Sequence, residues 1–130
     1  MIAGAMTKGD LEIIRCMPEH LGALIEKLEA AGAKLHVTPN SISIKGPETI
    51  KSVDIKTMPF PGFATDLQAQ FMALLTVARG NSFVTEKIYP ERFIHVPELQ
   101  RMGARIRKEG PTAIVEGVGG LCHSSFPRKR

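Results

Sequence analysis

Apolar residues recur along the chain at two spacings, and each spacing predicts one kind of element. Near the N-terminus, four aliphatic residues follow one another at i, i+3, i+4 and i+7 and so share one helical face: Leu21, Leu24, Ile25 and Leu28. Pro18 precedes this stretch, where a missing N–H removes no helical hydrogen bond. The pattern predicts an amphipathic helix from Pro18 to Ala31–Gly32.

Short runs rich in β-branched residues lie on either side of this helix. One run precedes it at 11–15, and two follow it at 34–38 and 41–45. Pro39 and Asn40 separate the last two runs and are typical turn residues. We therefore predict one strand before the helix and a hairpin after it.

A second helix is predicted after a further strand. The strand is expected at 53–57, and a Pro/Gly-rich loop follows it at 59–64. Thr65 is a favourable residue for a helix start, and the apolar pattern continues to about Arg79.

The same order of elements occurs twice, 71 positions apart. Residues 9–46 align with 80–117 without a gap, and small residues coincide at four landmarks: Gly9 with Gly80, Gly32 with Gly103, Ala33 with Ala104, and Gly46 with Gly117. The second copy has predicted strands at 82–86, 105–108 and 112–116, with a turn at Gly110 and Pro111. A constant period is typical of duplicated supersecondary units. We predict an α/β fold of repeated βαβαββ units, of which the chain holds about one and a half.

The two ends of the chain fit the repeat differently. Residues 2–8 align with 73–79, the end of the second helix, so we expect the chain to start inside a helix. Residues 119–130 show neither a strand nor a helix period and are basic. We expect 1–118 to be a fragment of one domain, and 119–130 to be an aberrant tail of the kind that a frameshift or truncated reading frame leaves.

Composition indicates a soluble globular protein. The chain has 130 residues, of which 43% are hydrophobic and 23% charged. No apolar run approaches the ~20 residues that span a membrane, and Lys8 and Asp10 interrupt the apolar start, so we expect neither a membrane segment nor a signal peptide. Two cysteines are too few for a disulfide framework, which favours a cytoplasmic location.

The net charge of +4 leaves a binding function open. Such a charge attracts phosphates, nucleotides or nucleic acid, so one alternative is a non-catalytic basic module for phosphate-rich ligands or nucleic acid. The chain has one Tyr, no Trp and no aromatic–basic alternation, which disfavours nucleic acid. Cys16, His20, Cys122 and His123 form no CxxC pair, and no phosphate-binding glycine loop or dinucleotide fingerprint occurs, so neither a metal nor a cofactor is predicted.

The loop at 59–64 leads to a candidate catalytic carboxylate. Thr65 and Gln68 have the spacing of a capping box, and Asp66 then lies in the first helical turn, where the helix dipole favours its ionised form. A stiff loop that presents a carboxylate at a helix start suits a general base. From these residues alone, the simpler interpretation is that Asp66 stabilises the helix end.

Three segments resemble the UDP-N-acetylglucosamine enolpyruvyl (1-carboxyvinyl) transferases. They are Pro-Phe-Pro-Gly-Phe-Ala-Thr-Asp-Leu-Gln-Ala-Gln-Phe at 59–71, Thr-Glu-Lys-Ile-Tyr at 85–89 and Arg-Phe-Ile-His-Val-Pro-Glu-Leu at 92–99. The resemblance extends from about residue 3 to residue 118. The sister enzyme enolpyruvylshikimate-phosphate synthase shares the fold but not these motifs.

The resemblance implies a reaction and two site residues. Asp66 matches the aspartate that accepts the proton of the sugar 3-hydroxyl, and Ile88 matches the aliphatic residue whose backbone contacts the uridine nucleotide sugar. Thr65 and Arg92 are further candidates. The implied reaction moves enolpyruvyl from phosphoenolpyruvate to UDP-N-acetylglucosamine with release of phosphate, the first committed step of peptidoglycan synthesis. The implied fold is an inside-out α/β barrel of two domains with the active site between them.

Departures from the family pattern lower the activity expected of this chain. The family's loop cysteine and the cations that hold phosphoenolpyruvate belong to segments that are absent, and neither Cys16 nor Cys122 aligns with that cysteine. Ala64 replaces a proline. We therefore expect the chain to be inactive without the missing domain segments. Arg92, His95 and Leu99 fall at helical spacing, which favours a surface or packing role for Arg92.

Overall fold

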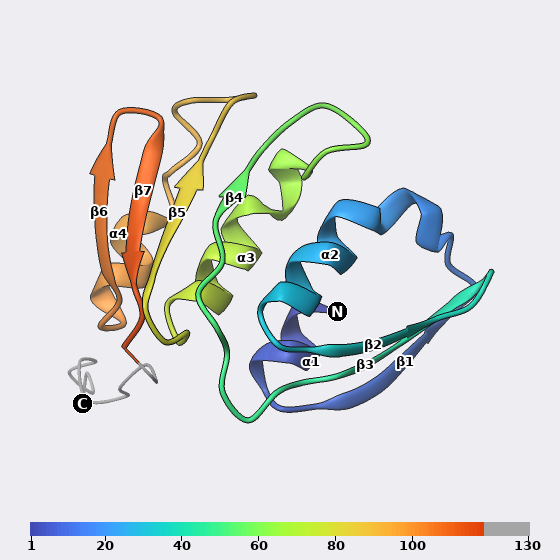
Figure 1. The fold of residues 1–130 in the computed structure, drawn as a ribbon. Helices are drawn as coiled ribbons and strands as arrows, with labels where there is room; N and C mark the ends of the chain where they lie inside the picture. The colour runs from blue at the N-terminus through green and yellow to red at the C-terminus, as the bar shows by residue number, and fades with distance from the viewer. Residues whose placement is uncertain (119–130) are drawn as a thin grey trace, which may run out of the picture.

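The computed structural model describes residues 1–118, and its elements follow the predicted order (Figure 1). The first half contains α1 (Ile2–Met6), β1 (Asp10–Ile14), the 3-10 helix η1 (Pro18–Leu21), α2 (Gly22–Ala30), β2 (Lys34–Val37) and β3 (Ser41–Lys45). The second half contains β4 (Ile55–Lys56), the 3-10 helix η2 (Thr65–Leu67), α3 (Gln68–Leu75), β5 (Asn81–Thr85), α4 (Val96–Arg101), β6 (Arg105–Glu109) and β7 (Thr112–Glu116). The predicted tail, 119–130, lies outside the described residues.

Each half forms its own sheet, and the two sheets share one register. Their strand orders are β1-β3-β2 and β4-β5-β7-β6, with only β4 and β5 parallel. Adding 71 to both members of each strand pair in the first sheet gives a strand pair of the second: Asp10–Lys45 becomes Asn81–Glu116, Ile13–Ile42 becomes Val84–Ala113, and Lys34–Lys45 becomes Arg105–Glu116. Residues 9–46 and 80–117 are thus the same strand–helix–strand–strand unit.

The central helices lie between the sheets. α3 packs against β5 and β7 and also against α1, which in turn packs against β3. Figure 1 shows α3 in the middle of the molecule, with one sheet on each side. The large apolar side chains buried there come from helices and strands of both halves: Leu28, Ile44, Phe71, Met72, Leu74, Leu75, Val84 and Val115. Burying one such side chain contributes roughly 1.5–3 kcal/mol, so this shared core joins the two sheets.

The described helices are all short. α2 has nine residues and α3 has eight. α1 lies at the start of the chain, where the alignment of 2–8 with 73–79 predicts a helix. Within residues 1–118, no helix has the length and apolar character needed to cross a membrane.

The second helix is shorter than the sequence predicts. We expected it to reach about Arg79, but α3 ends at Leu75. The Arg79 N–H donates to the Ile50 carbonyl at 2.9 Å, and the Arg79 carbonyl accepts the Ser52 N–H at 3.2 Å. The N–H groups of Thr76, Val77 and Ala78 still donate back to the last turn of the helix, and pairing with the earlier segment begins at Arg79. The prediction of a regular helix as far as Arg79 was therefore wrong.

The strand predicted at 53–57 is also shorter. Only Ile55 and Lys56 form β4, which pairs with the end of β5. The Val53 N–H donates to the hydroxyl of the buried Ser82 at 3.1 Å. Because this side-chain bond satisfies the Val53 N–H, the chain approaches β5 before regular pairing begins.

Two glycines at equivalent positions permit close approach of the backbone where each unit ends. The Gly46 N–H donates to the Gly9 carbonyl at 2.8 Å, and the Gly117 N–H to the Gly80 carbonyl at 2.9 Å. A Cβ at Gly46 would lie 2.6 Å from the carbonyl oxygen of Gly4, and one at Gly117 would overlap the Ala78 carbonyl.

We therefore expect Gly46→Ala and Gly117→Ala each to lower the free energy of unfolding, by about 1–3 kcal/mol or more, because overpacking forces the backbone to shift. Urea unfolding measures the change. Gly22→Ala is the matched control, because a Cβ there meets no neighbouring atom and the helical backbone accepts alanine. Parental stability in Gly117→Ala would contradict the predicted crowding.

Candidate functional site

The loop between β4 and η2 is folded onto itself and anchored in the core. The Met58 N–H donates to the Phe63 carbonyl at 3.0 Å. Phe63 is buried, and its ring meets the ring of Phe71 in α3 edge-on, with 5.4 Å between centroids. This anchor fixes where the chain enters η2, and therefore where Asp66 lies.

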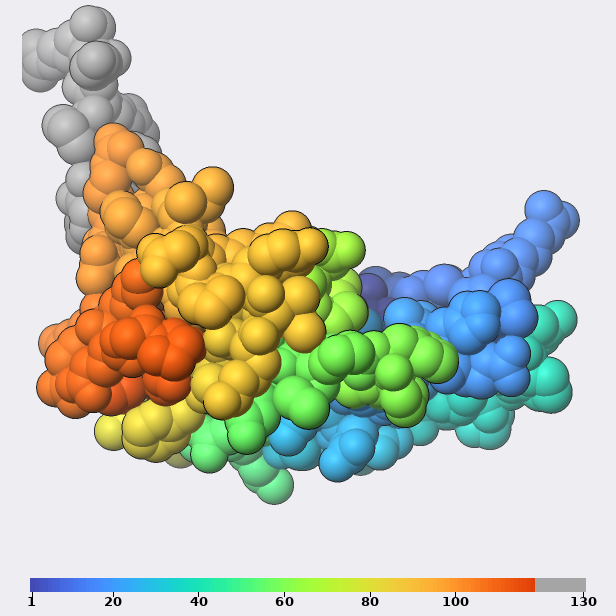
Figure 2. All heavy atoms as spheres, turned by 90° about the horizontal axis from the view of Figure 1, so that it is seen from above, coloured from blue at the N-terminus to red at the C-terminus, as the bar shows by residue number. Residues whose placement is uncertain are grey.

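The tip of this loop reaches the other half of the molecule. Phe60 is 73% exposed, and its ring lies edge-on to His20 of η1, with 6.2 Å between centroids. Figure 2 shows the loop, in green, beside the blue surface of that region. The loop therefore lies at the boundary between the two halves.

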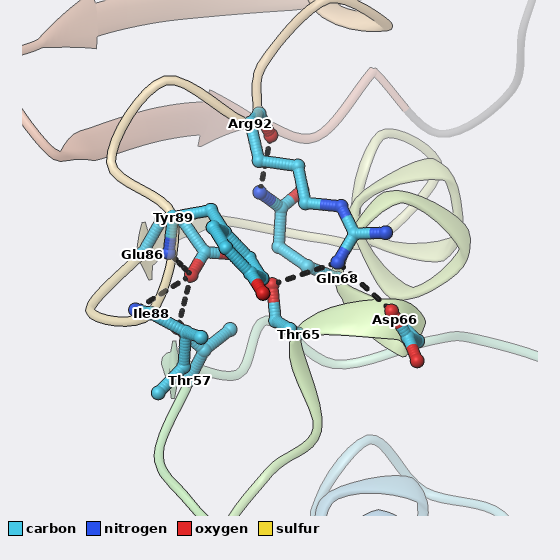
Figure 3. Close-up of polar contacts among 8 residues, drawn as sticks. All are labelled: Thr57, Thr65, Asp66, Gln68, Glu86, Ile88, Tyr89 and Arg92. Atoms are coloured by element: carbon cyan, nitrogen blue, oxygen red, sulfur yellow. Dashed lines mark hydrogen bonds and ion pairs between the residues drawn. The ribbon is translucent and has the colours of Figure 1, made fainter.

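Glu86, directly after β5, is fully buried and accepts four hydrogen bonds (Figure 3). The Thr65 hydroxyl donates to Oε1 at 2.7 Å, and the Thr57 hydroxyl donates to Oε2 at 2.6 Å. The N–H groups of Ile88 and Tyr89 also donate to Oε2, at 3.0 and 3.1 Å. One carboxylate thus connects three separate stretches of chain.

These donors keep the Glu86 carboxylate charged. Burial acts most strongly and raises the pKa of the group, because it disfavours the ionised form. The hydroxyls of Thr57 and Thr65 and the N–H groups of Tyr89 and Ile88 act in the opposite direction, and together they bring the pKa below its ordinary value of 4.5. The site therefore contains a buried anion that the fold compensates with neutral donors.

The predicted capping box is not formed. Thr65 donates its hydroxyl to Glu86, and neither 3-10 helix η2 nor α3 has a side-chain cap. Gln68 is fully buried and donates from Nε2 to the Arg92 carbonyl at 2.8 Å. The buried Glu86 carboxylate has lost its water donors, so the Thr65 hydroxyl points toward it, and the hydroxyl oxygen accepts from Arg92 at 3.3 Å instead of from a helix N–H. The Gln68 amide donates to the Arg92 carbonyl instead of turning back to the helix start.

Asp66 lies in the first turn of η2, as predicted, and its side chain is 82% exposed. The Arg92 guanidinium donates from Nη1 to Oδ1 of Asp66 at 2.8 Å and to the Thr65 hydroxyl at 3.3 Å. It also lies over the Tyr89 ring, 5.6 Å from the centroid. Figure 3 shows the second carboxylate oxygen of Asp66 pointing away from Arg92.

Of the surface or packing role favoured for Arg92, the surface position agrees with the structure, in which its side chain is 43% exposed. Arg92 lies before α4 and does not share its helical face, whereas His95 is the N-cap residue and its carbonyl accepts the Leu99 N–H at 3.1 Å. The segment before Pro97 instead folds back over η2, and this brings Arg92 to Asp66. Burial and the positive charge of Arg92 both lower the pKa of His95.

Ile88 lies in the turn after Glu86, on the other side of Thr65 from Asp66 in Figure 3. Its side chain is half-buried, and its N–H donates to Glu86. A main-chain contact between Ile88 and a ligand therefore falls to its carbonyl group. The structure brings Asp66, Thr65, Ile88 and Arg92 into one region.

Sequence reasoning missed Glu86 and Thr57 as parts of this region. The signal for Glu86 was present in the alternation along β5, since Ser82, Val84 and Glu86 lie at every second position and all three are buried. The signal for Thr57 was weaker, because the partner of its hydroxyl, Glu86, lies 29 residues away in the sequence. A carboxylate on the buried face of a strand therefore predicts hydrogen-bond donors from other segments around it.

The residues weighed as zinc ligands form no site in the described part of the chain. Within 1–118, no three His, Cys, Asp or Glu side chains lie close enough to hold a metal ion. Cys16 is half-buried, with its Sγ 3.7 Å from the carbonyls of Ile13 and Asn40. Cys122 and His123 lie outside the described residues.

Comparison with known proteins relates the chain to one family. The family described as EPSP synthase (3-phosphoshikimate 1-carboxyvinyltransferase) matches residues 1–125. The UDP-N-acetylglucosamine 1-carboxyvinyltransferase of Desulfosudis oleivorans is 53% identical over 118 residues, which are 91% of this chain and 28% of that protein. The enzyme of the same name from Parasynechococcus marenigrum is 54% identical over 121 residues, 93% of this chain and 28% of that protein. The chain thus spans about 28% of the length of these relatives.

Solved structures show the same fold. The enolpyruvyl transferase NikO from Streptomyces tendae superposes with a TM-score of 0.78 at 22% identity, covering 89% of this chain and 28% of that one. EPSP synthase from Acinetobacter baumannii superposes with a TM-score of 0.64 at 20% identity, covering 92% of this chain and 28% of that one. The predicted α/β fold, with about one and a half repeats of a larger architecture, is confirmed.

The lowered pKa of Glu86 predicts acid sensitivity. Because the folded pKa lies below the ordinary 4.5, the carboxylate's contribution to stability is complete above that pH and is lost as pH falls through the folded pKa. We expect Glu86→Gln to remove this part of the pH dependence, as measured by urea unfolding between pH 3 and 7. Glu91→Gln is the control for loss of one charge, since the Glu91 side chain is 95% exposed. If the free energy of unfolding of Glu86→Gln fell at low pH as it does in the parent, the lowered pKa of Glu86 would be contradicted.

Proposed function

The chain belongs to the EPSP synthase family of 1-carboxyvinyltransferases, and on that premise we propose that it supplies one wall of the active site of a UDP-N-acetylglucosamine 1-carboxyvinyltransferase. One observation carries the proposal. The conformation of the folded loop exposes the Asp66 carboxylate to solvent, and Arg92 holds one of its oxygens at 2.8 Å. This loop lies within the stretch that the relatives of that name share with the chain.

The proposed reaction gives Asp66 the role of proton acceptor. The 3-hydroxyl of UDP-N-acetylglucosamine forms a C–O bond to the enolpyruvyl carbon of phosphoenolpyruvate, its proton passes to Asp66, and phosphate leaves. A general base needs a free oxygen within hydrogen-bond reach of the hydroxyl. Since Arg92 contacts Oδ1, the oxygen that points away from it is the one available to the sugar.

The neighbours of Asp66 take supporting roles in this proposal. Arg92 orients the carboxylate, and its stacking on Tyr89 restricts the guanidinium. Thr65 precedes Asp66 and is fixed by Glu86. The carbonyl of Ile88 contacts the nucleotide sugar. Phosphoenolpyruvate and the acid that protonates it are held by the parts of the relatives that this chain does not span, and no cofactor is required.

Ion pairing of six of the fourteen lysines and arginines in residues 1–118 weakens the alternative of a basic binding module. Within the described residues, six cations are paired with carboxylates: Lys8 with Glu48, Arg92 with Asp66, Arg101 with Glu98, Arg105 with Glu116, Arg107 with Glu109, and Lys108 with Glu91. Paired cations attract phosphate groups less strongly than a cluster of free ones. We therefore assign neither nucleic acid nor membrane as a partner, and place the enzyme in cytoplasmic peptidoglycan synthesis.

The assignment of Asp66 is tested in a full-length relative in which residues 1–118 replace the matching segment. Asp66→Asn keeps the shape of the side chain and removes the proton acceptor, so turnover should fall about 10²–10⁴-fold. Loss of a charge near a helix N-terminus costs only ~0.3–1 kcal/mol, so the melting temperature should hardly change. Steady-state phosphate release and thermal unfolding measure the two effects.

Glu98→Gln is the matched control. It removes another first-turn carboxylate that has an arginine partner, in α4, with no contact to the loop. We expect normal turnover and a similarly small change in melting temperature. If Asp66→Asn behaves like Glu98→Gln, then Asp66 is a helix-end residue and the proposed role is lost.

We further propose that the chain is inactive by itself. Asp66 alone leaves the charge that develops on phosphoenolpyruvate uncompensated, because stabilisation of that charge requires cations aimed at it. No phosphate should be released from phosphoenolpyruvate and UDP-N-acetylglucosamine by the isolated chain. Release above that of the isolated Asp66→Asn variant would overturn this expectation.

A further inference from the structure

We propose that Glu86 is a positioning residue, whose buried carboxylate sets the separation between Asp66 and the main chain at Ile88. This inference rests on the proposed function, in which the nucleotide sugar contacts both Asp66 and the main chain at Ile88, so that their separation must match the bound sugar. Glu86 itself is buried and does not touch substrate. It acts through the two segments that it ties together.

The first segment is the loop that carries Asp66. Its two ends, Thr57 and Thr65, donate their hydroxyls to different oxygens of Glu86, at 2.6 and 2.7 Å. Hydrogen bonds to an ionised acceptor are short and about twice as strong as neutral ones. Because both ends are held, the loop moves only when Glu86 moves, and Asp66 directly follows the second held residue.

The second segment is the turn that carries Ile88. The N–H groups of Ile88 and Tyr89 donate to Glu86, and the Lys87 N–H donates to the Thr57 hydroxyl at 2.8 Å. Thr57 therefore takes part in both segments, as a donor to Glu86 and as an acceptor from Lys87. The two segments meet at one carboxylate and one hydroxyl, with no flexible linker between them.

The repeat shows that the fold does not require this carboxylate. The position equivalent to Glu86 in the first copy is Arg15, which is exposed and has a φ of +55°. The first copy nevertheless forms the same unit with the same register. A buried charge is costly unless it is fully hydrogen-bonded, and only the copy beside Asp66 contains one here. This difference assigns Glu86 to the site rather than to the scaffold.

The first test uses amide hydrogen exchange on the chain of 130 residues. Glu86→Ala removes all four acceptor contacts, and Ser82→Ala is the control, because Ser82 is an equally buried residue on the same face of β5 whose hydroxyl bonds to Val53. We expect Glu86→Ala to speed exchange at Ile88 and also at Met58 in the Asp66 loop by about tenfold or more. Ser82→Ala should leave both rates unchanged. Normal exchange at Met58 in Glu86→Ala would overturn the coupling of the two segments.

The second test uses the same full-length graft as for Asp66. Glu86→Gln keeps the volume but replaces one acceptor oxygen by an NH₂ group, so we expect kcat/KM for UDP-N-acetylglucosamine to fall, with about 10²-fold as the scale for a misplaced site. The fall should come mainly from a higher KM for the nucleotide sugar, with the KM for phosphoenolpyruvate unchanged, and Ser82→Ala should retain parental constants. Parental constants in Glu86→Gln would overturn the proposal. An inactive parent graft would refute the proposed function instead, and the exchange experiment would still decide whether Glu86 couples the two segments.

Discussion

A carboxylate removed from water needs hydrogen-bond donors in place of the water, and this requirement governs the region around Glu86. The donors are two hydroxyls and two N–H groups that come from the residue after β4, from η2 and from the turn after β5. The Thr65 hydroxyl donates to Glu86 and accepts from Arg92, so it points toward these two side chains and not toward the N–H groups of the helix that it begins. Asp66 follows Thr65 in η2, and its side chain faces solvent. The position of an exposed carboxylate is thus determined by a buried one.

The duplication separates what the fold needs from what the site needs. Both copies close with glycines in backbone contact and pair their strands in one register. Only the second copy adds the buried carboxylate and the arginine that reaches Asp66, since Glu86 and Arg92 align with Arg15 and Leu21. The repeated unit is therefore a scaffold, and the chemistry lies in side chains on one copy of it.

The sequence predicts the local elements well, because their signals are local. The apolar stripe of α2, the hairpin turn at Pro39 and the register of the two copies all follow from spacing and from turn residues. The failures all involve distant partners. The helix does not reach Arg79, which pairs with Ile50, and the hydroxyl of Thr65 points toward a glutamate 21 residues away. Periodicity holds no information about such competition, so the residues alone favoured a helix-end role for Asp66, only the family motif favoured a catalytic one, and Arg92 was given a surface or packing role.

Because the two copies share one register, charges at equivalent positions can decide which strands pair. Equivalent strands could pair across copies, and such exchange is a characteristic failure of repeat proteins. At one register position the central strands differ in sign, with Lys45 in β3 and Glu116 in β7. Pairing β1 with β7 would place Asp10 opposite Glu116, and pairing β6 with β3 would place Arg105 opposite Lys45; like charges directly opposite are destabilising. β2 is the exception, since Lys34 faces Lys45 and would gain an opposite charge beside Glu116 of β7, but its tight hairpin keeps it beside β3. The opposite charges of Lys45 and Glu116 thus favour the native pairing of β1 with β3 and of β6 with β7.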